Sequence, residues 1–435
     1  MKKIFIIIQI FIIFHPLFSQ NLLTIEEAVK LALNNNFSIQ IRKNEVEITK
    51  NNTSLGNAGF LPRIDLSGSY NTSVNNTNLE FFDGRVTERT GARSGSLNTG
   101  LALNWTLFDG FAMFINYDKL SQLNEISKLV LKSEIEEVLL NIYKTYYSIV
   151  SQKSIVKLAE ESISISRDRL NLTSLKTSVG SASEIEALQS RVYFNEDSSN
   201  FLNQKEILKS LKIQLNNILA RNPETEFDVV DTIALNQNLM TNLNFEDVKR
   251  RNTHILISEK NIAISDFDYN IIKSNFLPTL SFYGNLGYLN SYSDAGILKS
   301  NTQTGYSLGL NLSFNLFNGF RNSNDLENKK IISMNNQLNL KQVIENIHSA
   351  FTINMSNYKK YLELITLEEI NLSVARQNLD IATERLNQGV STPLEFREAQ
   401  QKFFQANNRL INAKYLAKMM ESELRKISGL LIFDY

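Results

Sequence analysis

Two stretches of the chain alternate apolar and polar residues with a period of two. In the first stretch, alternate residues over 64–74 and 97–107 are mostly apolar, and a polar loop separates the two runs. The second stretch repeats the pattern over 280–288 and 306–316. Paired runs of about ten alternating residues are typical of membrane β-strands. A soluble sheet with one solvated face has the same pattern, so the alternation alone leaves both interpretations open.

Beyond each pair of runs, the period of the apolar residues becomes helical. Positions spaced by three and four residues run from Ile135 to Leu170, and a second series runs from Ile344 to Leu379. Each series forms an a/d seam over about five heptads, which predicts a long packed helix. A helix over 112–175 is roughly 96 Å long at 1.5 Å per residue, which suits the wall of a tube better than a compact domain.

Shorter helical stretches flank the two long helices. Thr24 and Glu27 have the spacing of a capping box at the start of the first stretch. Ile185, Leu188 and Val192 give the second stretch an apolar stripe, which indicates an amphipathic helix. The predicted helices cover residues 24–55, 183–219, 245–274 and 393–428.

These patterns belong to two copies of one unit. The segment Leu107-Phe108-Asp109-Gly110-Phe111 recurs as Leu316-Phe317-Asn318-Gly319-Phe320, and Gly180 recurs as Gly389, both at an offset of 209 residues. A repeat preserved at fixed spacing indicates a repeated structural unit. The sequence therefore predicts two tandem repeats, each a β-hairpin followed by long helices.

The predicted boundaries follow from these patterns. Repeat 1 spans 20–220, with a hairpin at about 60–109, a long helix at about 111–176, a turn near 177–183 and a return helix at 183–219. Repeat 2 spans 245–429, with a hairpin at about 276–318, a long helix at about 320–386, a turn near 387–392 and a return helix at 393–428. Residues 221–244 link the repeats, and 430–435 form a C-terminal tail.

Residues 1–19 have the pattern of a signal peptide. Lys2 and Lys3 precede an apolar run over 4–14, and the small Ser19 provides a cleavage site. About eleven apolar residues are too few to span a bilayer, and no later run reaches the roughly 18 residues of a membrane helix. The mature chain is predicted to be exported and to meet a bilayer, if it does so, through β-strands.

Composition argues against several classes of function. Lys+Arg and Asp+Glu both number 45, so the net charge is zero and no electrostatic argument favours a nucleic-acid partner. Cysteine is absent and only three histidines occur. No phosphate-binding loop, HExxH zinc motif or Cys-His-Asp set is present in the sequence. We therefore expect no enzyme activity, no cofactor and no metal site.

With these features in place, the chain resembles the outer-membrane efflux protein family, the TolC-like channel-tunnels. The resemblance extends from about Leu22 to Gly429, and its most specific parts are the LFDGF and LFNGF corners and the segment from Arg385 to Glu395. It implies a homotrimer, with four strands per protomer in a twelve-stranded barrel above twelve packed helices and with the linker 221–244 at the equator. Barrel closure alone also permits a dimer.

The resemblance also implies a location and partners. The barrel lies in the lipid of a Gram-negative outer membrane, and the helices extend into the periplasm. There a periplasmic adaptor connects the tunnel to an inner-membrane pump, whose substrates the channel conducts passively. The nature of the substrate does not follow from the sequence.

In the family, acidic side chains shortly after the second turn glycine ring the periplasmic aperture. The matching residues are Glu395 and Glu398, and their counterparts in the first repeat are Glu186 and Gln189, where an amide replaces one carboxylate. Such a ring would attract cations; the alternative is that these side chains lie on a solvated helix face. The residues expected to contact the adaptor are Val179, Gly180, Ser181, Gln388, Gly389 and Val390.

Two other functions remain as alternatives. A secreted coiled-coil scaffold explains the heptads but not the matched spacing of the hairpins. A periplasmic adaptor has one helical hairpin flanked by glycine-rich β-domains, whereas this chain has two long-helix units and only 17 Gly. Both alternatives lack channel activity and predict a protein that is soluble without detergent.

Overall fold

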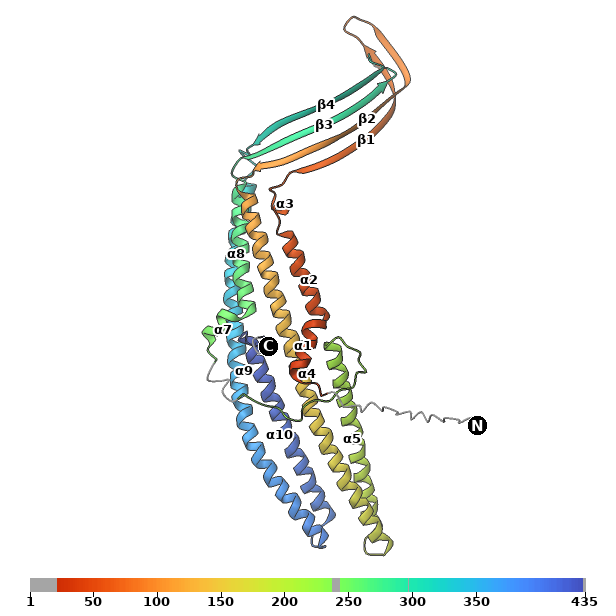
Figure 1. Cartoon of the computed structure of the whole chain (residues 1–435), viewed down its shortest axis with the longest axis vertical. Coiled ribbons are helices and arrows are strands. Elements are labelled where there is room, and N and C mark those ends of the chain that lie inside the picture. The colour runs from red at the N-terminus through yellow and green to blue at the C-terminus, as the bar shows by residue number, and fades with distance from the viewer. Residues whose placement is uncertain (1–21, 237–242, 296, 433–435) are drawn as a thin grey trace, which may run out of the picture. The chain divides into compact units, whose positions relative to one another are not determined.

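The computed structural model describes residues 22–236, 243–295 and 297–432 (Figure 1). Its strands are β1 (Arg63–Glu80), β2 (Val86–Phe108), β3 (Thr279–Ser293) and β4 (Ser300–Ser313). Its helices are α1 (Ile25–Asn35), α2 (Phe37–Asn52), α3 (Leu55–Ala58), α4 (Ala112–Ser178), α5 (Glu184–Ile218), α7 (Phe245–Arg251), α8 (Thr253–Ser274), α9 (Arg321–Asn387) and α10 (Pro393–Ile427). This combination confirms the predicted fold class of two β-hairpins with long helices.

Three predicted features extend beyond the described part of the chain. They are the signal peptide over 1–19, residues 237–242 of the linker and residues 433–435 of the tail. Among the described helices, none combines the length and the apolar composition needed to cross a membrane.

The described residues pack into two compact units, each built from both sequence repeats. Unit 1 contains the residues up to Gln40, Ser133–Asn252 and those from Ile347 onward. Unit 2 contains Ile41–Lys132 and Thr253–Asn346. The long helices α4 and α9 contribute residues to both units.

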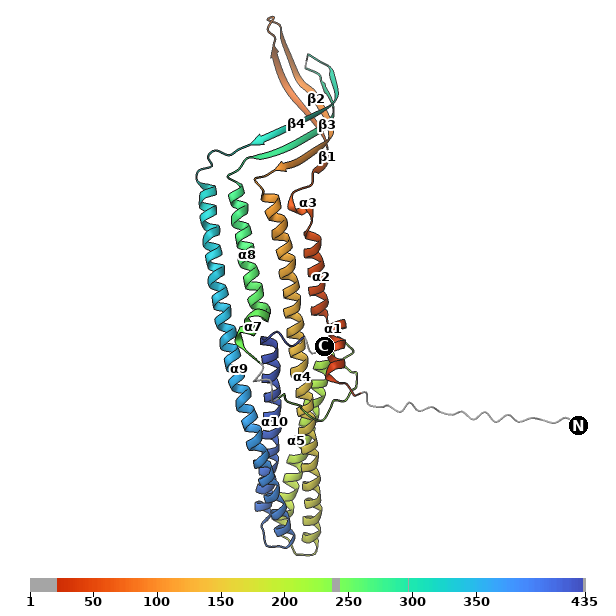
Figure 2. The same ribbon diagram turned by 60° about the vertical axis from the view of Figure 1, so that its left-hand side comes forward.

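Unit 2 contains a four-stranded antiparallel sheet in the order β1-β2-β3-β4 (Figure 2). One row of paired residues is Leu66, Leu101, Leu286 and Tyr306, and the next row is Ser67, Gly100, Gly287 and Gly305. Because successive residues of a strand point to opposite faces, the register places the apolar residues on one face. The other face carries mainly serine, asparagine and glycine. Within the described chain, β1 and β4 each pair with a single strand.

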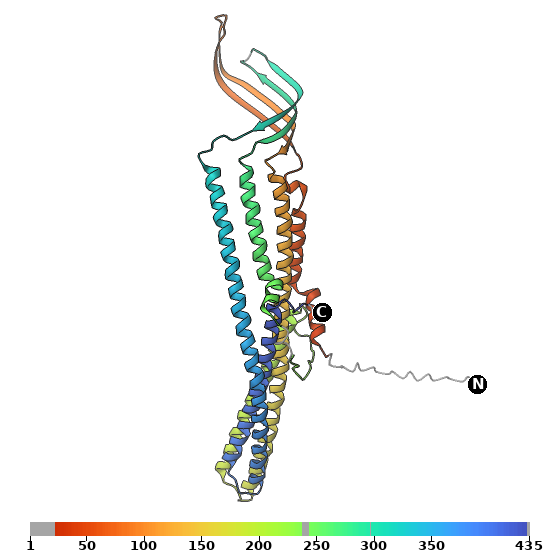
Figure 3. The same cartoon turned by 90° about the vertical axis from the view of Figure 1, so that its left-hand side faces the viewer.

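The helices of unit 2 form a row in the order α9, α8, α4 and α2 (Figures 2 and 3). Asp268 of α8 accepts hydrogen bonds from Lys119 of α4 at 2.6 Å and from Lys329 of α9 at 3.0 Å. Partial burial alone would raise the pKa of Asp268, but the two lysines outweigh it and lower this pKa below its ordinary value. Thr53, directly after α2, donates its hydroxyl to the carbonyl of Leu120 in α4 at 3.2 Å.

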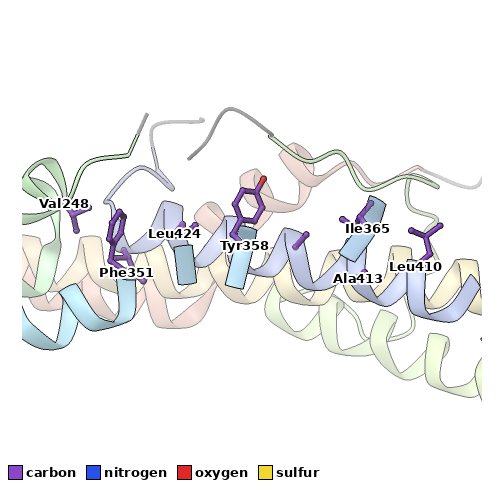
Figure 4. Packing of buried hydrophobic residues seen from close by; sticks show 9 residues of the cluster. Val248, Phe351, Tyr358, Ile365, Leu410, Ala413 and Leu424 are labelled. Carbon is purple, nitrogen blue, oxygen red and sulfur yellow. The ribbon is translucent and has the colours of Figure 1, made fainter. Parts of the chain in front are cut away.

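Unit 1 contains two helical hairpins, α4–α5 and α9–α10. Every position of the predicted a/d seam is buried or partly buried, both from Ile135 to Leu170 and from Ile344 to Leu379, which confirms the helical period. Around Tyr358 the seam packs against α10 (Figure 4). The Tyr358 hydroxyl donates to the carbonyl of Asn236 at 2.8 Å, and burial raises the pKa of Tyr358 to about 12.

The prediction of uninterrupted helices over 24–55 and 245–274 is wrong. Asn36 and Asn252 separate α1 from α2 and α7 from α8, with extended backbones at ψ 127° and 121°. The Asn36 side chain donates to the carbonyl of Ile218 at 2.8 Å, and the Asn252 side chain donates to that of Ile427 at 2.9 Å. Each asparagine therefore ends one helix and satisfies the last carbonyl of a return helix.

Candidate functional site

The α4–α5 and α9–α10 turns lie at the same end of unit 1 (Figures 1 and 2). Gly180 and Gly389 adopt φ values of 77° and 72°, a left-handed conformation that glycine tolerates without a steric cost. The N–H of Gly180 donates to Thr177 at 3.0 Å, and that of Gly389 donates to Leu386 at 3.1 Å. The residues predicted to contact an adaptor are all exposed here: Val179, Gly180, Ser181, Gln388, Gly389 and Val390.

Glu186 and Glu395 occupy equivalent positions in the two return helices. The Ser183 hydroxyl accepts the N–H of Glu186, and the Thr392 hydroxyl accepts the N–H of Glu395, each at 3.3 Å. Ser183 and Thr392 are thus the N-caps of α5 and α10. Acidic residues in this first turn are favoured by the helix dipole whatever their function.

The two glutamates of α10 that were predicted at the aperture, Glu395 and Glu398, differ in their surroundings. The Ser391 hydroxyl donates to the Glu395 carboxylate at 2.5 Å. This hydrogen bond, with help from Arg385, lowers the pKa of Glu395 below its ordinary value. Glu398 lies nearly one turn further along and is exposed, with no hydrogen-bond or ion-pair partner in the described part of the chain. Of these two carboxylates, Glu398 is therefore the more available to a solute.

The first repeat presents a different surface. Glu186 is half-buried. Burial of Arg169 lowers the pKa of this arginine, and the nearby charge of Glu186 opposes that effect. Gln189 is exposed beside a surface groove of about 270 Å³ that Leu188 and Tyr193 help to line. Among the four predicted aperture residues, the exposed carboxylates are therefore the two on α10.

The apolar stripe predicted on the return helix does not pack within the protomer. Ile185, Leu188 and Val192 are 67%, 57% and 62% exposed. The side chains that α5 buries include the polar Ser190 and Asp197. Polar groups can occupy this packed face because each has a partner, Thr173 for Ser190 at 3.2 Å and Arg397 for Asp197.

An ion pair that the sequence does not predict joins Arg397 of α10 to Asp197 of α5. Nη1 and Nη2 of Arg397 each lie 2.9 Å from a carboxylate oxygen of Asp197, and the side chains are only 7% and 10% exposed. The guanidinium also lies 4.8 Å from the centre of the Tyr193 ring. Phe396 and Ala399, on either side of Arg397, are both buried. These apolar neighbours are the sequence signal that Arg397 lies beside the packed face of α10.

Comparison with known proteins gives a consistent result. The model of the outer membrane efflux protein family matches residues 28–221 and 245–430. No curated protein sequence matches the chain significantly.

Solved outer-membrane channels share the fold at low identity. The CmeC channel of Campylobacter jejuni is 17% identical, with a TM-score of 0.77 over 93% of this chain and 85% of that one. VceC of Vibrio cholerae is 14% identical, with a TM-score of 0.73 over 93% and 96%. The open MtrE channel of Neisseria gonorrhoeae is 13% identical, with a TM-score of 0.73 over 93% and 89%.

The family model covers most of the chain, including both hairpins, both long helices and both turns. The chain therefore belongs to the outer membrane efflux protein family, as an outer-membrane efflux channel whose helical part lies in the periplasm.

Proposed function

We propose that the chain is one subunit of a closed ring that conducts substrates passively across the outer membrane. The ring would serve a tripartite efflux or secretion system. The observation that carries the proposal is a four-stranded sheet that is apolar on one face and unpaired at both edges.

The sheet meets the requirements of a barrel segment in lipid. Leu66, Leu101 and Leu310 are exposed on its apolar face, where acyl chains can cover them. An unpaired strand edge is not tolerated in lipid, because its N–H and C=O groups have no water to bind. Membrane barrels have at least eight strands, so β1 of one copy must pair with β4 of another. Three copies, the number implied by the family resemblance, give twelve strands.

The helices of unit 2 support the same closure. Ile41 and Ile48 are exposed on α2, and Ile331, Met334 and Leu338 are exposed on α9. These two helices form the ends of the row, in the same order as the edge strands β1 and β4 (Figure 2). An apolar stripe at each end suits a head-to-tail contact, which generates a ring when the rotation closes.

The partners follow from this arrangement. The exposed turns at 179–181 and 388–390 are the proposed contact with a periplasmic adaptor, through which an inner-membrane pump delivers substrate. The sequence has no phosphate-binding loop, so the pump would supply the energy. Neither a cofactor nor a nucleic acid has a role in this scheme.

Glu398 and Glu395 are the proposed aperture carboxylates, and Glu186 and Gln189 are their proposed counterparts on α5. Repeated in each subunit, Glu398 would place several charges at one level and favour cations. Glu395 is engaged by Ser391 and by its cap, so we expect it to contribute less.

Ion selectivity in planar bilayers tests this assignment. Glu398→Gln is expected to shift the reversal potential in a salt gradient toward zero and to raise the concentration of a trivalent cation needed for half-block at least several-fold. Glu395→Gln should have a smaller effect, and the double variant the largest. Glu363→Gln is the matched control, because Glu363 is an exposed carboxylate on α9 and outside the proposed aperture. An unchanged reversal potential in the double variant would mean that both residues lie on a solvated helix face and do not form the aperture.

The alternative of a soluble scaffold or adaptor without channel activity is disfavoured by the same sheet. A soluble protein would leave a broad apolar face of leucines and tyrosines in water, and patches of that kind mark an interaction surface.

A further inference from the structure

The two corners between strand and helix contain an unusual backbone conformation. Phe111 and Phe320 have φ values of 72° and 64°, directly after Gly110 and Gly319 at 70° and 67°. A bulky residue at positive φ is sterically disfavoured, whereas glycine adopts the conformation freely. The same strained backbone conformation of a phenylalanine therefore occurs at both corners, 209 residues apart.

Both phenylalanines also stand where a polar residue would be favoured. The carbonyl of Phe111 accepts the N–H of Ile115 at 3.3 Å, and the carbonyl of Phe320 accepts that of Asn324 at 3.0 Å. They thus directly precede α4 and α9, at the N-cap position, where Ser, Thr, Asp and Asn stabilise a helix best. Neither phenylalanine follows the preference for glycine at positive φ or the preference for a polar residue before a helix. Sites that depart from local preferences in this way are often functional.

Burial does not account for these side chains. Phe111 is 56% exposed and Phe320 is 67% exposed. Each ring makes an edge-to-face contact with the phenylalanine three residues earlier, Phe108 at 5.1 Å and Phe317 at 5.3 Å. Together with the exposed Phe114, they form the corner aromatics, defined here as Phe108, Phe111, Phe114, Phe317 and Phe320.

The corner aromatics lie where the apolar sheet gives way to charged helices. Leu107 and Leu316, both exposed, precede them at the ends of the apolar runs. On the helix side, Arg321 follows Phe320 directly, and Lys273 lies at the end of α8, next to Ser274, whose carbonyl lies against Gly110. Girdles of aromatic residues flank the apolar band of membrane barrels at both interfaces, and basic side chains near a bilayer are attracted to anionic lipid headgroups.

We propose that Phe111 and Phe320 are lipid anchors. Their rings insert among the acyl chains just beneath the headgroups of the periplasmic leaflet, while Lys273 and Arg321 contact the phosphates. The occupant is phospholipid because the patch continues the apolar face of the sheet and adjoins exposed positive charge. The inference rests on the proposed barrel and adds the residues that fix its depth in the membrane.

Fluorescence quenching by lipid tests the anchors. In a Trp105→Phe background, which removes the one native tryptophan, tryptophan is placed singly at Phe111, Phe320, Leu310 or Val179. Each full-length variant is reconstituted in phosphatidylethanolamine and phosphatidylglycerol vesicles that carry bromine at chosen depths of the acyl chains. Phe111→Trp and Phe320→Trp are expected to be quenched most strongly by bromine near the headgroup. Leu310→Trp should be quenched by deeper bromine, and Val179→Trp, at the α4–α5 turn, by none.

The controls separate failure of the anchors from failure of the barrel. Quenching of Phe111→Trp and Phe320→Trp by aqueous acrylamide but not by lipid would overturn the anchors and place the rings in water. Protection from both quenchers would also overturn them, because a neighbouring subunit would then cover the rings. If Leu310→Trp is also unaffected by lipid, the proposed barrel fails as well.

Discussion

Leu310→Arg is expected to destabilise the folded chain in a bilayer by about 2–4 kcal/mol, the cost of a cation on the lipid face near the midplane. Asn311→Arg, one residue further along β4, should change the stability little. Leu310 pairs with Phe282 and Asn311 pairs with Ser281, so the two side chains lie on opposite faces of the sheet. In the proposed barrel, arginine at 310 enters lipid and arginine at 311 enters a wet lumen.

Urea unfolding in phospholipid vesicles measures both variants under identical conditions. The comparison is internal, because the two substitutions have the same chemistry and adjacent positions on one strand. Equal stability of the two variants would mean that both faces meet the same solvent, which is incompatible with a membrane barrel.

Arg397→Met is expected to lower the free energy of unfolding by about 3–5 kcal/mol, because it leaves Asp197 charged and buried without its partner. The double variant Arg397→Met with Asp197→Leu should recover most of this loss, since apolar pairs of similar volume often replace buried ion pairs without cost. Thermal unfolding of the detergent-solubilised protein, followed by circular dichroism, gives both values.

Lys414→Met provides the control on the same helix. Lys414 lies 2.9 Å from Glu369, and the two side chains are 37% and 53% exposed, so loss of this pair should cost at most about 1 kcal/mol. If Arg397→Met is no more destabilising than Lys414→Met, the pair between α5 and α10 contributes nothing to the packing of the two return helices.

Features that depend on local periodicity could be predicted from the sequence. The alternation from Ile64 to Val74 and the a/d seam from Ile135 to Leu170 depend on residues close in the chain, and the structure contains the corresponding strand and helix. The breaks at Asn36 and Asn252 could not be predicted this way. Their side chains bond carbonyls 182 and 175 residues away, so no local pattern indicates them.

The candidate site shows the same limit. The equivalence of Glu186 and Glu395 follows from spacing, and both lie three residues after an N-cap. The ion pair between Asp197 and Arg397 joins residues that are 200 positions apart. Both residues interrupt apolar patterns, and a single sequence does not show which distant residue each of them contacts. An apolar stripe such as that of Ile185 does not reveal whether it packs within one protomer or against the next.

Single-channel recording of the purified chain, freed of residues 1–19, tests the central claim most directly. Added from detergent to a planar phospholipid bilayer, the protein is expected to insert in discrete steps of equal conductance with a preference for cations. A protein that stays soluble without detergent and produces no conductance steps would contradict the assignment of this chain as an outer-membrane channel.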